Sequence, residues 1–174
     1  MPAIFIGRFQ LFHKGHLEAI KWILKREKEI FITIGSSQES LTKENPFSFS
    51  ERKKMIEETL KSEKIKKFKI YGMPDFKNDI FWAKKILKIT KLNLKEAIVF
   101  SQNPWTKRCF QKIGVKVKAH PMFYNNLSAT QIREKIIHNK NWRSLVPKTV
   151  LDFFKNINGK KRIESLNKII QKTA

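Results

Sequence analysis

Two histidines, His13 and His16, follow the first apolar run of the chain within the stretch GRFQLFHKGH. That run ends at Gly7, and after Gly15 the apolar residues recur at helical spacing, so the histidines stand where a strand gives way to a helix. The start of a helix offers free backbone N–H groups and the positive end of its dipole, which favour an anion. Gly15 also allows a close approach of the backbone. The spacing predicts that His13 and His16 donate hydrogen bonds to a phosphate.

Zinc binding is the competing chemistry for a histidine pair at this spacing, but it needs further ligands. Cys109, His120 and His138 lie in unrelated segments, and none of them is paired with another Cys or His at ligand spacing. We therefore expect no metal site built from protein side chains. A histidine pair at this spacing is, without further context, most simply explained as capping or surface residues.

The chain lacks the two glycine-rich phosphate-binding motifs, the P-loop GxxxxGK[ST] and the dinucleotide-binding GxGxxG. Side chains and helix ends must therefore hold the phosphate.

A second group with the same chemistry lies in the stretch LSATQIREK. Ser128-x-x-Gln131 is a capping-box pattern, which predicts that a helix begins after Ser128. Thr130 and the first-turn amides make this helix start suitable for a phosphate, and Arg133 adds a cation one turn further on. Taken alone, Ser128 and Thr130 would be read as capping residues. Two helix starts of this kind in one chain favour phosphate binding.

The hydrophobic pattern predicts the elements that position these residues. Short apolar runs at 3–7, 30–35, 68–71 and 97–101 are typical of buried strands, and VKVKA at 115–119 is typical of an edge strand because charges alternate in it. Helical spacing runs from 15 to about 28, and Ser48-x-x-Glu51 is another capping box. The first strand, helix and strand form a β-α-β unit, which predicts a doubly wound, Rossmann-like α/β fold with a parallel sheet.

The end of the chain shows helical patterns and no further strand. We therefore expect one domain over residues 1–174, with 147–174 as a helical C-terminal extension. No stretch approaches the roughly 20 apolar residues of a membrane span, and the first residues do not resemble a secretory signal. A single cysteine fits a reducing compartment. These features predict a soluble protein of the cytoplasm.

The formal net charge of +22 raises the possibility of a nucleic-acid partner. Only seven of the 37 basic residues are arginines, and the lysines are scattered through every segment. Such a pattern favours a solvated surface over a dedicated polyanion site. In either case a positive field attracts phosphorylated substrates.

The sequence resembles the nucleotidyltransferase superfamily defined by a [His/Thr]-x-Gly-His motif, and within it the archaeal-type nicotinamide-nucleotide adenylyltransferases. The resemblance runs nearly end to end, through GRFQLFHKGH, GSSQESLTKENPFSFSER, DFKNDIFW, FSQNP, LSATQIR, WRSLVPKTV and NGKKRIESL. It implies that AMP is transferred directly from ATP to nicotinamide mononucleotide, giving NAD and pyrophosphate.

The resemblance also implies roles for individual residues. His13, His16 and Arg133 would be catalytic, as stabilisers of charge on the phosphates. The residues implied to contact ATP are Gly7, Arg8, Phe9, His13, His16, Ser101, Asn103, Ser128, Thr130 and Arg133. The residues implied to contact the acceptor are Asn78, Asp79 and Trp82, with Trp82 stacked on the nicotinamide ring. Mg²⁺ would enter with ATP, and the family suggests a homo-oligomer, often a hexamer.

Two alternatives remain open at the level of the sequence. One is the same transfer onto another phosphate acceptor, such as phosphopantetheine or flavin mononucleotide. The other is a basic nucleic-acid-binding domain, although nucleic acid is the less expected partner. Asp79 stands where the family has Asn, which predicts a preference for the amide acceptor over the acid one.

Overall fold

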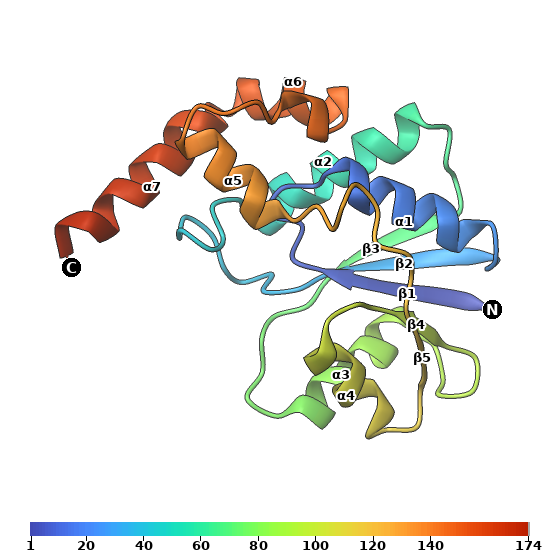
Figure 1. The fold of residues 1–174 in the computed structure, drawn as a ribbon. Helices are drawn as coiled ribbons and strands as arrows, with labels where there is room; N and C mark the ends of the chain where they lie inside the picture. The colour runs from blue at the N-terminus through green and yellow to red at the C-terminus, as the bar shows by residue number, and fades with distance from the viewer. Residues whose placement is uncertain (174) are drawn as a thin grey trace. The chain divides into compact units, whose positions relative to one another are not determined.

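In residues 1–173, which the computed structural model describes, five strands form one parallel sheet in the order β3-β2-β1-β4-β5 (Figure 1). The strands are β1 (Pro2–Gly7), β2 (Glu29–Ile34), β3 (Phe68–Gly72), β4 (Ile98–Phe100) and β5 (Lys116–Lys118). Strand β5 forms one edge, and its exposed Lys116 and Lys118 flank a half-buried Val117. The alternating charges therefore predicted its edge position correctly, since charged side chains protect an exposed edge from pairing.

Strand β1 lies at the point where the strand order reverses. Phe5 of β1 is in register with Ile32 of β2 on one side and with Phe100 of β4 on the other. Open α/β sheets bind ligands beyond the carboxyl ends of their strands at such a reversal. Gly7 ends β1 at this place. The predicted doubly wound, Rossmann-like α/β class is confirmed.

Helices follow the strands in the predicted order. They are α1 (Lys14–Leu24), α2 (Phe49–Ser62), α3 (Asp79–Thr90), α4 (Pro104–Gln111), α5 (Ala129–Ile137), η1 (Arg143–Leu145, a 3-10 turn), α6 (Lys148–Asn156) and α7 (Gly159–Thr173). The segment predicted as a helical extension contains α6 and α7, and its last residue, 174, lies outside the described residues. None of the described helices combines the length and the apolar character that a membrane span requires.

The chain packs as two compact units, and each is assembled from separate stretches of sequence. Unit 1 contains Met1–Arg8, Glu18–Gln38 and Lys67–Pro121. Unit 2 contains Phe9–Leu17, Glu39–Lys66 and the chain from Met122 onward. The units are not consecutive along the chain, because it passes between them several times. A single domain over residues 1–174 remains a prediction.

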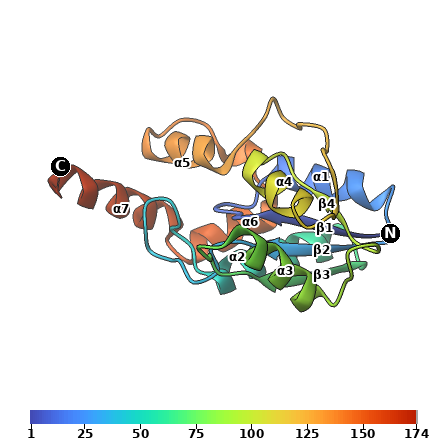
Figure 2. The same ribbon diagram turned by 90° about the horizontal axis from the view of Figure 1, so that it is seen from below.

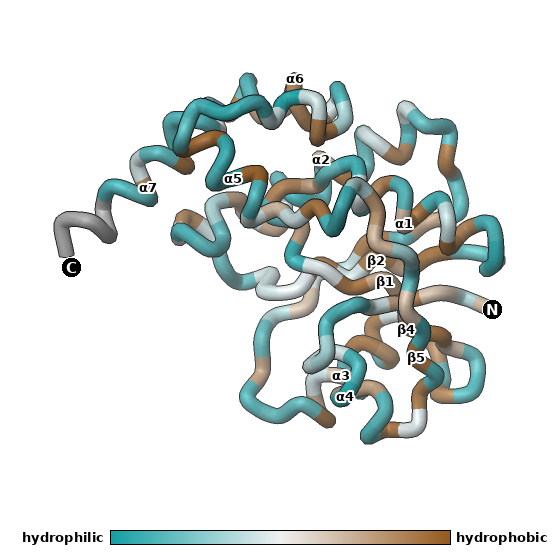
Figure 3. The backbone as a smooth tube through the Cα atoms, viewed as in Figure 1, coloured by the Kyte–Doolittle hydropathy of each residue, from teal (hydrophilic) through white to brown (hydrophobic). Residues whose placement is uncertain are grey.

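Unit 1 is the sheet with its own helices. Helices α3 and α4 lie side by side over one face of the sheet (Figures 1 and 2). Their buried core includes Ile4 and Val99 from the strands and Trp82, Ile86 and Phe110 from the helices. The strands β1 and β2 carry hydrophobic stretches (brown in Figure 3), as expected for parallel strands buried on both faces.

The first helix ends earlier than its pattern predicted, at Leu24 and not near Lys28. The amide of Arg26 bonds to the carbonyl of Ile23 at 2.9 Å, which tightens the chain beyond the helix into a 3-10 turn. The guanidinium of Arg26 donates to the carbonyl of Trp22 at 3.0 Å and stacks on its ring, with 3.8 Å to the centroid. Arg26 therefore satisfies a terminal carbonyl and ends the helix.

Unit 2 is helical. Helix α2 packs on α6, and α7 packs on both α5 and α6. Thr59 of α2 and Thr149 of α6 share a hydrogen bond of 2.7 Å between their hydroxyls. Gly159 at the start of α7 allows this packing, since a Cβ there would lie 2.4 Å from the ring of Phe154. Any larger residue would require the Phe154 ring or α7 itself to shift.

Candidate functional site

His13 and His16 hold each other in a fixed arrangement. The backbone N–H of His13 donates to Nδ1 of His16 at 3.3 Å, and the backbone N–H of His16 donates to Nδ1 of His13 at 3.3 Å. The two imidazole rings are stacked, with centroids 3.5 Å apart and an angle of 21° between their planes. A Cβ on Gly15 would lie 3.0 Å from Nδ1 of His13, so glycine suits this close turn.

This arrangement decides which ring nitrogens can donate. Because Nδ1 accepts a hydrogen bond in both rings, the proton of a neutral imidazole must be on Nε2. Burial lowers the pKa of His13 to about 3, so His13 is neutral at physiological pH. Both histidines can therefore donate from Nε2 to an anion without first becoming charged.

Gln10, which the sequence pattern did not single out, anchors the histidine loop (residues 9–16, which are the loop after β1 and the first turn of α1 with His16). Its side-chain amide exchanges two hydrogen bonds of 2.9 Å with the backbone N–H and carbonyl of Phe47. Gln10 is 2% exposed, and its amide also lies 3.5 Å from the side chain of Asn45. A polar side chain within an otherwise apolar run was the only signal for it. Phe9 just before it has a φ of +52°, so the loop starts with a left-handed turn.

Arg133 of α5 reaches the same loop. Its guanidinium donates to the backbone carbonyl of Gln10, and a second nitrogen lies 3.3 Å from the hydroxyl of Thr130. Ser128 caps α5 as predicted: its hydroxyl accepts from the N–H of Gln131 at 3.2 Å, and the Gln131 side chain accepts from the N–H of Ser128 at 2.8 Å. The structure thus brings the start of α5 and the histidine loop together within unit 2.

Arg162 of α7, which carried no local signal, fastens the loop that Gln10 holds. Its guanidinium lies 2.8 Å from both carboxylate oxygens of Glu51 and 3.4 Å from the carbonyl of Pro46. It also lies over the ring of Phe47, 5.6 Å from the centroid. Glu51 in turn accepts from the N–H of Ser48 and completes the predicted capping box of α2. Arg162 therefore ties α7 to the backbone that anchors Gln10.

The remaining ATP candidates lie in unit 1. Gly7 is the last residue of β1 and Arg8 follows it, and Ser101 and Asn103 follow β4. The buried Ser101 hydroxyl accepts from the N–H of Asn103 at 3.1 Å, and the Asn103 side chain accepts from the N–H of Thr106 at 3.1 Å. The pair therefore shapes the turn after β4 and caps α4.

The acceptor candidates lie at the start of α3. Asn78 is the N-cap, since its side chain accepts from the N–H of Phe81 at 2.9 Å. The carboxylate of Asp79 accepts from the indole N–H of Trp105 at 3.0 Å and lies 3.8 Å from the amino group of Lys112. Asp79 is therefore not the cap of this helix; it orients Trp105.

Trp82 is a core residue of α3. It is 3% exposed and packs against the rings of Trp105 at 4.7 Å and Phe110 at 5.8 Å between centroids. Cys109 is buried on the neighbouring helix α4, where burial and the charge of Asp79 raise the pKa of its thiol. Within the described residues no three His, Cys, Asp or Glu side chains cluster in a way that could hold a metal ion.

The structure therefore groups the predicted residues into two sets. Phe9, His13, His16, Ser128, Thr130 and Arg133 belong to unit 2. Gly7, Arg8, Asn78, Asp79, Trp82, Ser101 and Asn103 belong to unit 1. The first set consists of neutral N–H and hydroxyl donors with one guanidinium, which is a composition suited to phosphate oxygens.

Comparison with known proteins agrees with this chemistry. The cytidylyltransferase-like family matches residues 4–135. The nicotinamide-nucleotide adenylyltransferase of Thermococcus sibiricus is 38% identical over 175 residues, which cover 99% of this chain and 92% of that protein. The enzyme of the same name from Saccharolobus solfataricus is 41% identical over 166 residues, covering 94% and 95%.

A solved structure is also similar over nearly the whole chain. It is a bifunctional NMN adenylyltransferase/ADP ribose pyrophosphatase from Francisella tularensis, complexed with AMP and a manganese ion. The TM-score is 0.82 at 25% identity, over 98% of this chain and 54% of that one, so this chain spans about half of the bifunctional protein. With relatives above 30% identity over nearly their full length, the chain belongs to the nicotinamide-nucleotide adenylyltransferases of the cytidylyltransferase-like family.

Proposed function

We propose that this chain is a nicotinamide-nucleotide adenylyltransferase, which converts ATP and nicotinamide mononucleotide to NAD and pyrophosphate. One observation carries the proposal: the reciprocal hydrogen bonds of His13 and His16 orient two neutral Nε2 donors on a loop to which Arg133 is also bound. The names of relatives that share nearly the full chain support the same activity.

The reaction needs alignment and charge stabilisation. A phosphate oxygen of the mononucleotide attacks the α-phosphorus of ATP, a new P–O bond forms, and the bond to the bridging oxygen of the β-phosphate breaks as pyrophosphate leaves. The nucleophile is already an anion, so no general base is required. Alignment supplies up to roughly 7–11 kcal/mol of the barrier reduction, and each well-placed donor roughly 3 kcal/mol.

The residues of unit 2 supply the donors in this scheme. His13 and His16 donate from Nε2 to phosphate oxygens, and Arg133 offsets the charge that develops on them. Ser128 and Thr130 bind the triphosphate at the start of α5, where the helix dipole also favours an anion. Phe9 lines the nucleotide site.

The residues of unit 1 bind the two nucleosides in this scheme. Gly7, Arg8, Ser101 and Asn103 contact the adenosine part of ATP. Asn78, Asp79 and Trp82 contact the acceptor. A stacking role for the buried Trp82 requires that its exposed neighbour Trp105 swing aside.

Mg²⁺ enters this scheme together with ATP. The side chains of unit 2 proposed for the phosphates are hydrogen-bond donors and a cation, so they fit phosphate oxygens and do not fit a metal ion. We therefore propose that Mg²⁺ would be held mainly by the phosphates of ATP and would neutralise part of their charge.

The central test is His16→Ala in an assay with ATP, Mg²⁺ and nicotinamide mononucleotide. Loss of one transition-state donor lowers kcat by about two to three orders of magnitude while the thermal melt stays cooperative. His138→Ala is the matched control, because His138 is exposed at the end of α5. A folded His16→Ala protein with near-normal kcat would disprove the assignment.

The acceptor is tested with the wild-type protein. We expect NAD and pyrophosphate from nicotinamide mononucleotide, and much less product from phosphopantetheine or flavin mononucleotide. A higher rate with either of those acceptors would assign the chain a different adenylyltransferase activity. Salt-dependent binding of DNA or RNA without any ATP turnover would favour the nucleic-acid alternative.

Two further properties belong to the proposal. We propose that the enzyme works in the cytoplasm, in keeping with its single free cysteine, and that it forms a homo-oligomer such as a hexamer. Cell fractionation and sedimentation velocity test them. Recovery of the protein outside the cytoplasmic fraction would reject the proposed location. A monomer at assay concentrations would reject the proposed homo-oligomer.

A further inference from the structure

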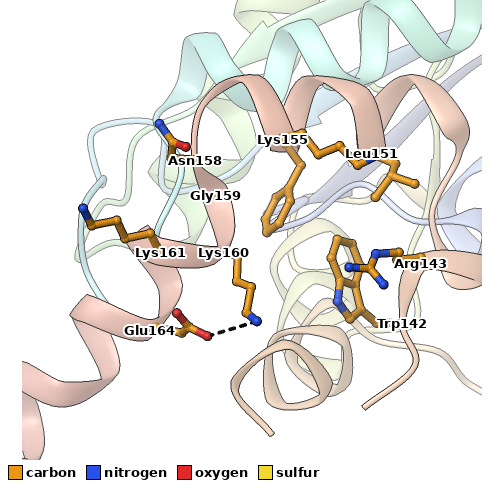
Figure 4. A pocket seen from close by; sticks show the side chains of 10 residues that line it. Trp142, Arg143, Leu151, Lys155, Asn158, Gly159, Lys160, Lys161 and Glu164 are labelled. Carbon is orange, nitrogen blue, oxygen red and sulfur yellow. Dashed lines mark ion pairs between the residues drawn. The ribbon is translucent and has the colours of Figure 1, made fainter. Parts of the chain in front are cut away.

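A cavity of about 400 Å³ lies in unit 2 between η1, α6 and α7 (Figure 4). This volume is within the range of small-molecule sites, which is roughly 300–1,000 Å³. None of the residues proposed above for ATP or the acceptor lines it. The lining residues are Trp142, Arg143, Leu151, Phe154, Lys155, Asn158, Gly159, Lys160, Lys161 and Glu164.

One wall of the cavity is aromatic. The rings of Trp142 and Phe154 pack edge to face with centroids 5.0 Å apart, and the two residues are 7% and 2% exposed. Leu151 extends this apolar wall. Both rings are almost wholly buried, so an occupant can touch only their exposed parts, which together with Leu151 form an apolar wall against which a planar ring can pack.

The rim of the cavity is strongly basic. Four cations line it against one carboxylate, that of Glu164. Lys160 is 3.6 Å from Glu164 and donates to the side chain of Asn139 at 2.7 Å, whereas Arg143 and Lys155 have no ion pair or side-chain hydrogen bond with any described residue. Unpaired cations at the mouth of a cavity favour an anionic occupant, and a guanidinium suits phosphate in particular.

The lysine side chains at the cavity differ in the direction in which they point. The amino end of Lys160 and the indole of Trp142 point toward the same hollow, whereas Lys161 points away from it (Figure 4). The backbone N–H groups at the start of α7 lie beside this hollow because Gly159 lets the helix approach Phe154. Their dipole adds to the positive field at the cavity.

We propose that this cavity is a second binding site, for a small aromatic phosphate of the size of a mononucleotide. The ring packs against the exposed part of Trp142 and against Leu151, and the phosphate binds Arg143, Lys155 and Lys160. The proposal does not depend on the proposed function, because it shares no residue with the site of AMP transfer.

The test uses AMP as the probe and Trp142 as the reporter. A full-length variant with Trp22→Phe, Trp82→Phe and Trp105→Phe keeps Trp142 as its only tryptophan. We expect saturable quenching of Trp142 by AMP, and at least tenfold weaker binding of adenosine or inorganic phosphate alone, since each lacks one half of the recognised chemistry. No saturable quenching, or equally tight binding of adenosine, would overturn the proposal.

A matched pair of variants separates specific contacts from the general positive field. Arg143→Ala with Lys155→Ala weakens AMP binding at least tenfold, whereas Lys140→Ala with Lys148→Ala, which removes two exposed lysines that do not line the cavity, leaves it unchanged. Equal weakening in both pairs would mean that only net charge attracts AMP.

A second measurement keeps the proposal testable if the three-tryptophan variant does not fold. In wild-type protein labelled with ¹⁵N, the indole N–H signal of Trp142 is assigned from Trp142→Phe. It shifts on AMP addition and does not shift when Arg143 and Lys155 are both replaced. If the Trp142 indole signal of the wild-type protein does not shift when AMP is added, the proposed site is wrong.

Discussion

His13 is a buried imidazole that contributes by remaining neutral. It is 3% exposed, it accepts from the backbone N–H of His16, and its pKa is lowered by burial to about 3. A protonated ring would lose the acceptor at Nδ1 that holds the pair together. The orientation of His13 therefore depends on its imidazole ring remaining neutral.

The pKa of His13 predicts a pH dependence of stability. The ordinary pKa of histidine is 6.5, so between about pH 6 and pH 4 the unfolded chain binds a proton that the folded chain does not. The stabilisation is complete above the unfolded pKa and is lost as pH falls, with a slope of about 1.4 kcal/mol per pH unit.

Urea denaturation of wild type and His13→Gln at pH 4–7 measures this slope. We expect a shallower decline of the free energy of unfolding in His13→Gln, and no change in slope in His138→Gln, because His138 is exposed. Parallel curves for wild type and His13→Gln would show that His13 titrates normally.

Asp79 combines a charge with an orienting hydrogen bond to Trp105. Asp79→Asn removes the charge and keeps an acceptor for the indole N–H. We predict that kcat/KM for the acid acceptor then rises relative to the amide acceptor, because a carboxylate no longer faces a carboxylate. The gain is at most about tenfold, since the side chain is 35% exposed and Lys112 offsets its charge.

Comparing kcat/KM for nicotinamide and nicotinic acid mononucleotide in wild type, Asp79→Asn and Asp79→Ala decides between charge and orientation. If Asp79 only orients Trp105, the ratio of the kcat/KM values for the two acceptors is the same in all three proteins. In that case Asp79→Ala alone loses activity on both acceptors.

At the scale of elements, the histidine loop is held directly by two segments and indirectly by a third. Helix α5 contacts it through Arg133, and the segment before α2 contacts it through Gln10. Helix α7 in turn holds that segment and α2, because Arg162 bonds to Pro46 and Glu51. Both capping boxes satisfy backbone groups at these helix starts, where capping contributes about 1 kcal/mol each. The loop is thereby oriented by elements that lie far from it in sequence.

Gln10→Leu tests this connection. It leaves the N–H and carbonyl of the buried Phe47 without partners, so we predict a loss of about 2–4 kcal/mol of unfolding free energy. It also lowers kcat, because the loop loses its anchor to Phe47 and no longer holds the backbone carbonyl of Gln10 in place for Arg133.

Chemical denaturation and steady-state kinetics on the same preparation measure both effects. Gln111→Leu is the control, since this exposed glutamine makes no described side-chain hydrogen bond. A loss no greater than that of Gln111→Leu would mean that Gln10 is not an anchor.

At the scale of the whole molecule, the net charge of +22 acts on substrates that are polyanions. A positive surface raises the encounter rate of such substrates, and salt screens the effect within about 10 Å at 0.1 M. We predict that kcat/KM for ATP falls several-fold as KCl rises from about 0.05 M to about 0.5 M, with a smaller change in kcat.

A series in uncharged osmolyte separates screening from changes in water activity. Values of kcat/KM that stay constant with salt, or that fall equally in osmolyte, would show that the lysines do not steer ATP.

The sequence by itself determined the fold class and the places where chemistry is possible. Buried strands, helical spacing and capping boxes are local patterns, so the doubly wound parallel sheet and the caps Ser48 and Ser128 agree with expectation. The pair His13 and His16 is local too, since its reciprocal hydrogen bonds span three residues.

Only the tertiary structure decided which distant residues support that pair. Gln10 bonds Phe47 across 37 positions, and Arg162 bonds Glu51 across 111, and no periodicity encodes a contact of that range. Packing likewise assigned Trp82 to the core and gave Asp79 the indole of Trp105 as its partner. Local patterns follow from the backbone of a few residues, whereas these partners depend on how whole helices pack.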